Sequence, residues 1–224
     1  SSSLENSKRL VMSRDYGQYC GLARSLDVVG DRWNLLIVRQ LLMGPARYGE
    51  LREGLSGIAT NLLTDRLRDL ETAGVIERQL SGDSSAITYA LTAWGAQLRA
   101  PINALVRWST PLMIRGPEND EFRPEWLLVA LPALFEGRVP TDHSATVGIV
   151  VDGAMVQLRA TESGIVVSNP DGRELAAVLT ANAHLVLGLA TGMLSLDDVR
   201  TVVDIDGNES ALRCFLEAPL SRSR

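Results

Sequence analysis

The chain has 224 residues, enough for two modest domains that each bury a core of their own. Its 46% apolar and 22% charged residues are ordinary for a globular protein and exclude a disordered or collagen-like chain. The net charge of −5 is divided unevenly, because residues 12–116 carry a balance of +2 and residues 117–224 a balance of −8. Phosphate would repel the acidic half, so any nucleic-acid contact is expected in the first half.

The remaining bulk features concern location and processing. Cys20 and Cys214 fall in different halves and form neither a disulfide framework nor a metal cluster, which suits a reducing compartment. No secretory signal and no apolar run long enough for a bilayer is visible, so we expect a cytoplasmic protein without a membrane partner. Residues 1–11 hold Lys8, the only lysine, and we interpret them as an appended expression remnant before Met12.

Residues 12–115 are predicted to form helices followed by one hairpin. Two helices are expected at 22–29 and 33–41, with Asp31 as the N-cap of the second. A short segment at 48–55 precedes a longer helix at 59–73, whose buried stripe consists of Leu63, Leu67 and Leu70. Strands are expected at 75–80 and 86–91 around a polar turn. A last helix at 93–109 contains Pro101, where we expect a kink.

This order of elements is typical of a winged helix-turn-helix, whose second helix enters the major groove of DNA. The buried stripe of the helix at 59–73 leaves polar side chains on its outer face: Thr60, Asn61, Thr64, Asp65 and Arg68. Asparagine can pair bidentately with adenine, and threonine can contact thymine. Arg47 and Arg66 are expected to contact phosphates. The alternative is that these residues form an ordinary solvated face.

The first half resembles the HxlR-type winged-helix regulators, relatives of the MarR class. The resemblance rests on Gly-Asp-Arg-Trp at 30–33, Gly-Pro-Ala-Arg-Tyr-Gly-Glu-Leu at 44–51, and matching stretches at 63–71, 74–78 and 89–92. It covers about residues 15–110 and implies a dimer that binds an inverted-repeat operator in duplex DNA. It also implies that the first and last helices pair the subunits, through the apolar side chains of Leu22, Leu26, Leu105 and Trp108.

Two departures from the family pattern concern DNA contacts. Ala59 stands where the family often has serine, which removes one phosphate contact. The wing turn at 81–85 carries Asp83 and no cation, so Arg78 at the wing base is the remaining wing cation.

Cys20 lies where some members of this family carry a redox-sensing cysteine. The resemblance therefore implies a redox-sensing alternative, in which oxidation or alkylation of the Cys20 thiolate releases DNA. The other interpretation is a cysteine that packs at the dimer interface as a small apolar group.

The second half, 124–224, follows a polar linker at 116–123 and is predicted to be an α+β domain. A helix is expected at 124–135, and strands at 147–152 and 155–160 flank an Asp152-Gly153 turn. Further strands are expected at 165–167, 177–179 and 202–205, and helices at 183–190 and 209–216. Residues 187–198, with the following strand and Asp-Gly-Asn at 206–208, resemble sterol-carrier-like domains. Such domains enclose an apolar cavity, which implies a hydrophobic small-molecule effector. The alternative is a domain whose apolar residues fill their own core.

The predicted fold class is thus α+β, with a winged helix-turn-helix domain at 12–115 and a sterol-carrier-like domain at 124–224. The favoured function is a homodimeric, sequence-specific DNA-binding transcription regulator modulated by an apolar ligand. The alternatives are a hydrophobic-ligand carrier that uses its winged half for dimerisation, and the Cys20 redox switch. His143 and His184 are isolated, and no catalytic set or phosphate loop stands out, so we expect no enzyme activity, metal or cofactor. No ligand-binding residue is predicted.

Overall fold

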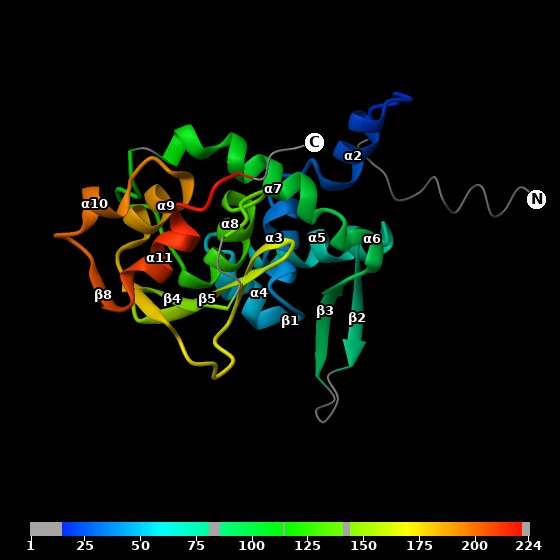
Figure 1. Cartoon of the computed structure of the whole chain (residues 1–224). Coiled ribbons are helices and arrows are strands. Elements are labelled where there is room, and N and C mark those ends of the chain that lie inside the picture. Colours follow the sequence, from blue (N-terminus) through cyan, green and yellow to red (C-terminus); the bar gives the residue numbers. More distant parts are fainter. Residues whose placement is uncertain (1–14, 81–85, 114, 141–143, 221–224) are drawn as a thin grey trace, which may run out of the picture. The chain divides into compact units, whose positions relative to one another are not determined.

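The computed structural model describes residues 15–80, 86–113, 115–140 and 144–220 (Figure 1). Its contacts divide the chain into two compact units, residues 1–102 and 103–224. The division falls inside helix α7 (Arg99–Trp108), and the predicted linker at 116–123 lies within the second unit. The segment interpreted as an expression remnant lies outside the described residues, as does His143.

From residue 15 on, where the structure describes the chain, the first unit begins with four helices: α2 (Gly21–Val29), α3 (Asn34–Leu42), α4 (Tyr48–Gly54) and α5 (Thr60–Thr72). These helices lie where apolar periodicity predicted them. The predicted stripe of α5, formed by Leu63, Leu67 and Leu70, is buried. Asp31 is not the N-cap of α3, which begins at Asn34 after a turn. The Asp31 carboxylate instead accepts a hydrogen bond from Arg66 on α5, at 2.8 Å. An acidic residue before a helix can therefore form an ion pair with a distant part of the chain instead of capping the helix.

The wing is a three-stranded antiparallel sheet in the order β1-β3-β2. The predicted hairpin is confirmed as β2 (Ile76–Leu80) and β3 (Ile87–Leu91), and its turn at 81–85, with Asp83, lies outside the described residues. The third strand, β1 (Ala46–Arg47), was not predicted, because two residues are too few to show an alternating pattern. It pairs Ala46 with Tyr89 and Arg47 with Thr88, which places the start of α4 at the wing.

The last predicted helix of the winged half is two helices, α6 (Ala93–Ala96) and α7. The interruption falls at Gln97 and Leu98 rather than at Pro101. Pro101 lies in the first turn of α7, where a backbone N–H has no partner within the helix, so the proline is accommodated without a kink.

The second unit begins in α7 and is built on a five-stranded sheet in the order β6-β5-β4-β7-β8. Its strands are β4 (Thr146–Val151), β5 (Ala154–Thr161), β6 (Gly164–Ser168), β7 (Ala177–Thr180) and β8 (Asp204–Gly207). All neighbours are antiparallel except β4 and β7, which are parallel and are joined through β5 and β6. The last strand begins two residues later than predicted, since Val202 lies in the preceding turn and is exposed.

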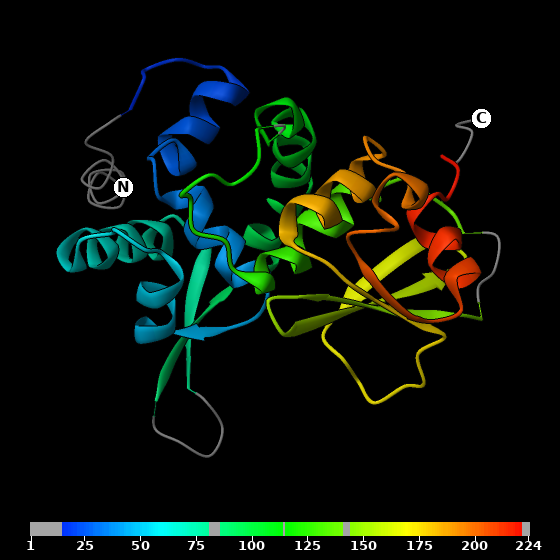
Figure 2. The same ribbon diagram turned by 90° about the vertical axis from the view of Figure 1, so that its left-hand side faces the viewer.

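Helices cover one face of this sheet, as Figure 2 shows for α9 (Ala183–Thr191) and α11 (Glu209–Leu216). Helix α8 (Leu127–Leu134) is followed by Phe135, which is buried in the core of the second unit. The remaining short helices are η1 (Thr110–Met113), η2 (Pro124–Trp126) and α10 (Leu196–Val199).

The Asp152-Gly153 turn between β4 and β5 is confirmed. Asp152 has a φ of 50° and Gly153 a φ of 78°, the two left-handed residues of a type I′ hairpin turn. The turn fixes the register, so that Val147, Ile149 and Val151 face the helices and are completely buried.

The core of the second unit lies between the sheet and its helices. Phe135, Leu158 and Phe215 are each at most 2% exposed and belong to one apolar cluster with residues of α8, α9 and α11. Among the described residues, no helix has the length and apolar character needed to cross a membrane.

Candidate nucleic-acid interface

Helix α5 presents a polar face that contains the residues predicted to read bases. Thr60, Asn61 and Thr64 lie in its first turns and are exposed, while Leu63 and Leu67 anchor the opposite face. Arg68 continues this face one turn further along and is 65% exposed. The helix therefore brings four of the predicted contacts onto one exposed surface, with short hydrogen-bonding groups near its N-terminus.

Tyr48, at the start of α4, holds the start of α5 in place. Its hydroxyl donates to the Thr60 carbonyl oxygen at 2.9 Å and lies 3.3 Å from the Thr64 hydroxyl. The Thr64 hydroxyl itself donates to the Thr60 carbonyl at 3.0 Å. Sequence reasoning missed this role of Tyr48, because no local pattern predicts that a tyrosine at a helix terminus will contact a residue twelve positions away.

The arginines of the winged unit differ in how firmly the protein holds them. Arg66 is only 17% exposed and forms ion pairs with Asp31 at 2.8 Å and Asp69 at 3.2 Å. Arg66 therefore joins α5 to the segment before α3, and this geometry disfavours the phosphate contact that we predicted for it. A largely buried guanidinium with two carboxylate partners is costly to withdraw, since both ion pairs would have to break together.

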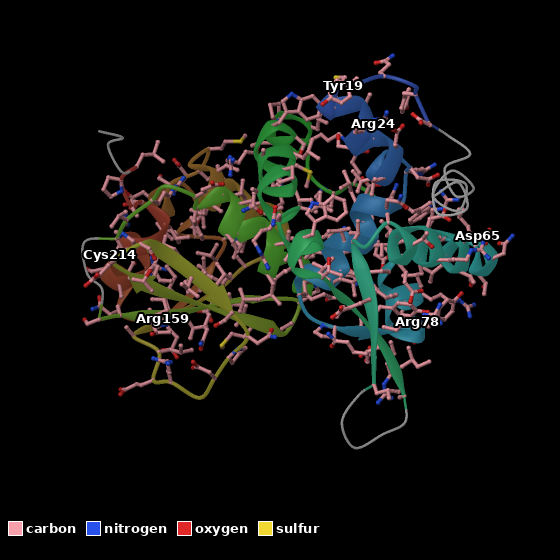
Figure 3. The ribbon with its side chains drawn as sticks, turned by 90° about the vertical axis from the view of Figure 1, so that its right-hand side faces the viewer. Tyr19, Arg24, Asp65, Arg78, Arg159 and Cys214 are labelled. Carbon is pink, nitrogen blue, oxygen red and sulfur yellow. The ribbon has the colours of Figure 1, made fainter. Side chains whose placement is uncertain are left out.

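Arg68 and Arg78 are themselves at least half exposed and pair with partly exposed carboxylates. Arg68 pairs with Asp65 at 2.6 Å, and Arg78 on β2 pairs with Glu71 at 2.9 Å. Arg78 also lies over the ring of Tyr89, with its guanidinium carbon 6.0 Å from the ring centre. Exposed ion pairs contribute at most about 1 kcal/mol, so a phosphate can displace these carboxylates at small cost. Figure 3 labels Asp65 on α5 and Arg78 on the wing.

Two further cations lie on or beside α4, the helix before α5. Arg47 is exposed at the N-cap of α4, where its backbone N–H donates to Glu50 at 2.6 Å. Arg52 is exposed in the last turn of the same helix and forms no ion pair with any described residue. Sequence reasoning did not single out Arg52, whose signal was a lone arginine between apolar positions of a short helix.

The residues predicted to pair subunits are exposed apolar side chains. On α2, Leu22 is 68% and Leu26 40% exposed, and on α7, Leu105 is 46% and Trp108 74% exposed. Tyr19, which precedes α2 and is labelled in Figure 3, is fully exposed. Large apolar side chains left in water on amphipathic helices favour burial against another chain.

Cys20 lies directly before α2, at its N-cap position, and is exposed. The nearby backbone N–H groups of Ala23 and Leu22 lower the pKa of its thiol below the ordinary value. Cys214 lies on α11 of the second unit and is partly buried. Among the described residues, no group of histidine, cysteine and carboxylate side chains has the arrangement of a metal site.

The described residues of the second unit show an apolar groove of about 60 Å³ beside α9. Its walls include Phe122, Leu187 and Met193, and His184 lies exposed at its margin. This volume is far below the roughly 300–1,000 Å³ of ordinary small-molecule sites.

Comparison with known protein families matches residues 28–115 to an HxlR-like helix-turn-helix model. An HTH-type transcriptional regulator of Synechocystis is 34% identical over 90 residues, which are 40% of this chain and 67% of that protein. The regulator YodB of Bacillus subtilis is 33% identical over 86 residues, 38% of this chain and 77% of YodB. A regulator of Mycobacterium tuberculosis is 38% identical over 99 residues, and the match spans 44% of this chain and 61% of that protein.

Solved structures of similar sequence include reduced YodB of Bacillus subtilis, at 31% identity and a TM-score of 0.39 over 44% of this chain and 99% of that chain. Another is PA1607, a transcription factor, at 36% identity and a TM-score of 0.40 over 48% and 70% of the two chains.

Proposed function

The chain belongs to the HxlR-like helix-turn-helix family of transcription regulators, and from that premise we propose that it binds a specific operator in duplex DNA as a homodimer. The observation that carries the proposal is the polar face of α5, which stands exposed on a helix anchored by a fully buried leucine stripe. A rigid helix with short polar groups in its first turns is suited to read base edges in the major groove.

In this proposal Asn61 pairs with a base edge, and Thr60 and Thr64 contact neighbouring bases. The carbonyl of Thr60 and the hydroxyl of Thr64 are already held by Tyr48, so the start of the helix is ordered before DNA arrives. Arg47, Arg52, Arg68 and Arg78 contact phosphates. Arg66 serves as a brace within the unit, for the reasons given above. The net charge of the first half is small, and these few cations supply the electrostatic attraction.

The homodimer is proposed to form through α2 and α7. Leu22, Leu26, Leu105 and Trp108 supply the exposed apolar surface that a second copy would bury. A two-fold dimer presents its recognition helices about one turn of DNA apart, roughly 34–36 Å, so the operator is expected to be an inverted repeat.

The second unit is proposed to be a sterol-carrier-like domain that binds an apolar effector. Its α9, Gly192, α10 and β8 follow one another in the order that suggested the resemblance. A ligand of ordinary size would have to enlarge the groove of about 60 Å³ beside α9. The small volume of this groove gives the hydrophobic-carrier alternative less support than the regulator.

A second candidate function is redox sensing at Cys20. It is favoured by one observation, that the thiol is exposed and its pKa is lowered by two backbone N–H groups. Oxidation there would place a bulkier, polar sulfur directly before α2, the helix proposed to pair the subunits.

Fluorescence anisotropy with the upstream region of the gene, against a scrambled duplex and across a salt series, tests the regulator. We expect selective binding whose logarithm falls linearly with the logarithm of salt concentration, with a slope that reflects several phosphates. Equal and weak binding of both duplexes at low salt would refute the proposal. The double variant Asn61→Ala, Thr64→Ala is the matched control, because it retains every arginine and should bind both duplexes alike.

A further inference from the structure

The winged unit contains a cavity of about 510 Å³ that the proposed DNA contacts do not use. It lies between α2 and the segment that carries α6. Its apolar part is formed by Val28 and Val29 from α2, by Val75 after α5, and by Leu98 after α6. This volume lies within the usual range for small-molecule sites, and all its walls come from one compact unit.

The walls of this cavity favour an aromatic occupant. Trp94 of α6 lines it and is still 55% exposed, so much of the indole face is available for stacking. Gln97 lines the same cavity, and its carboxamide has no hydrogen-bond partner among the described residues. It can therefore donate to an acceptor on a bound molecule.

The charge at the cavity favours an uncharged occupant. Arg24 is the charged residue of its wall, and its guanidinium is paired with Asp15 at 3.0 Å and with Asp27 at 3.4 Å. Two carboxylates therefore offset this cation, and a carboxylate or sulfonate ligand would have to displace them. An aromatic amine cation would lie against apolar valines without a partner of its own.

The cavity touches the joint between the recognition helix and the wing. The Val75 N–H donates to the carbonyl of Leu70 in α5 at 2.9 Å, and the Val75 carbonyl accepts from the Thr92 N–H at 3.1 Å. Gly95 packs so closely that a Cβ there would overlap the Val75 carbonyl oxygen. A molecule seated against Val75 and Trp94 would thus contact the residues that connect α5, β2 and α6.

We propose that this cavity binds an uncharged, planar aromatic molecule that carries a hydrogen-bond acceptor. Trp94 stacks on the aromatic plane, Gln97 donates to the acceptor, and Val28, Val75 and Leu98 bury the apolar edge. Any effect of this molecule on operator affinity rests on the proposed function, whereas its binding to the chain does not.

Calorimetry of the full chain with 2-naphthol tests the site, because this probe is planar, uncharged at neutral pH and no electrophile toward Cys20. We expect saturable binding of one probe per chain. Trp94→Ala should weaken it by about three- to tenfold, the loss expected for one aromatic contact, while Trp94→Phe should retain most of it. Ser25→Phe, which fills the cavity from the exposed face of α2, should abolish binding, and Ser25→Ala should not.

The proposal is overturned if the wild-type chain shows no saturable binding, or if Trp94→Ala and Ser25→Phe bind the probe as the wild type does. Circular dichroism of each variant shows that a loss of binding is not a loss of fold. Operator binding is measured separately without the probe. If the chain binds the probe but no specific DNA, the proposed function fails and the aromatic site stands.

Discussion

The hydroxyl of Tyr48 lies 2.9 Å from the carbonyl oxygen of Thr60, and this contact ties the first helix of the DNA-binding motif to the start of the second. The same hydroxyl lies beside the side chain of Thr64. One side chain thus fixes the position of two residues proposed to read bases.

Removing this hydroxyl should loosen the motif without emptying its core. We expect Tyr48→Phe to lower the free energy of unfolding by about 0.5–1.5 kcal/mol, the usual net contribution of one hydrogen bond. Urea denaturation measures this loss. Tyr89→Phe is the matched control, because the Tyr89 hydroxyl has no hydrogen bond among the described residues, and it should leave stability unchanged. Equal effects of the two substitutions would refute the role of Tyr48.

Asn61 should carry sequence selectivity rather than general affinity. We expect Asn61→Ala to reduce discrimination between operator and scrambled duplex by about 1–3 kcal/mol, the contribution of one bidentate base contact. Anisotropy titrations with both duplexes measure it. Thr72→Ala, at the other end of the same helix, should retain the wild-type ratio. If Asn61→Ala instead lost the same affinity for both duplexes, Asn61 would contact the DNA phosphate backbone rather than a base.

Arg52 should contribute a phosphate contact. We expect Arg52→Gln to weaken binding of all sequences alike and to reduce the slope of log affinity against log salt by about one. Arg159→Gln, on β5 of the second unit and labelled in Figure 3, should leave the slope unchanged. An unchanged slope in Arg52→Gln would remove this residue from the interface.

Gly95 should tolerate no side chain. An added Cβ would overlap the carbonyl oxygen of Val75, so we expect Gly95→Ala to cost about 1–3 kcal/mol of stability through overpacking. Gly49→Ala is the control on α4, where a Cβ meets no atom within 4 Å. It should be neutral or stabilising by up to about 1 kcal/mol, since alanine favours a helix. Thermal unfolding of both variants checks this: the melting temperature should fall for Gly95→Ala and should not fall for Gly49→Ala.

The lowered pKa of Cys20 has a consequence for its reactivity with pH. The thiolate is the reactive form, and backbone N–H groups of α2 stabilise it, so alkylation should accelerate as pH rises through a value below that of an ordinary cysteine. Iodoacetamide kinetics from pH 5 to 10, read by peptide mass analysis, separates Cys20 from Cys214. A midpoint at or above about 8.5 would contradict this prediction. Under the redox-sensing alternative, Cys20→Ser should abolish oxidant-induced release of DNA and leave operator binding intact.

Apolar periodicity was enough to predict the helices and strands whose buried residues are regularly spaced. The leucines of α5 recur at helical spacing, and the valines around Asp152-Gly153 alternate as in a strand. Helix α5 and the β4–β5 hairpin both lie where these patterns predicted them. Periodicity could not predict β1, whose two residues become a strand only because β3 lies beside them. Nor could it separate α6 from α7, since the apolar spacing continues through the interruption at Gln97 and Leu98.

The exposed face of α5 was predictable, because the buried leucine stripe determines which of the remaining residues of the helix face solvent. Ion pairing was not, because partners such as Asp31 and Arg66 are 35 residues apart and no local pattern joins them. For the same reason the sequence suggested Arg66 as a phosphate contact, and the folded chain instead gives that guanidinium two carboxylates.

Strand β8 ends the five-stranded sheet at one side, and its exposed residues include Asp204 and Asp206. An open edge normally invites the edge of another sheet to hydrogen-bond to it, the first step toward fibrous aggregates. Two copies approaching through β8 would bring four carboxylates together, and the repulsion would rise as their backbones came into register. The acidic character of the second half thus acts as protection against polymerisation. Asp204→Val with Asp206→Val should make a concentrated solution aggregate while leaving each chain folded.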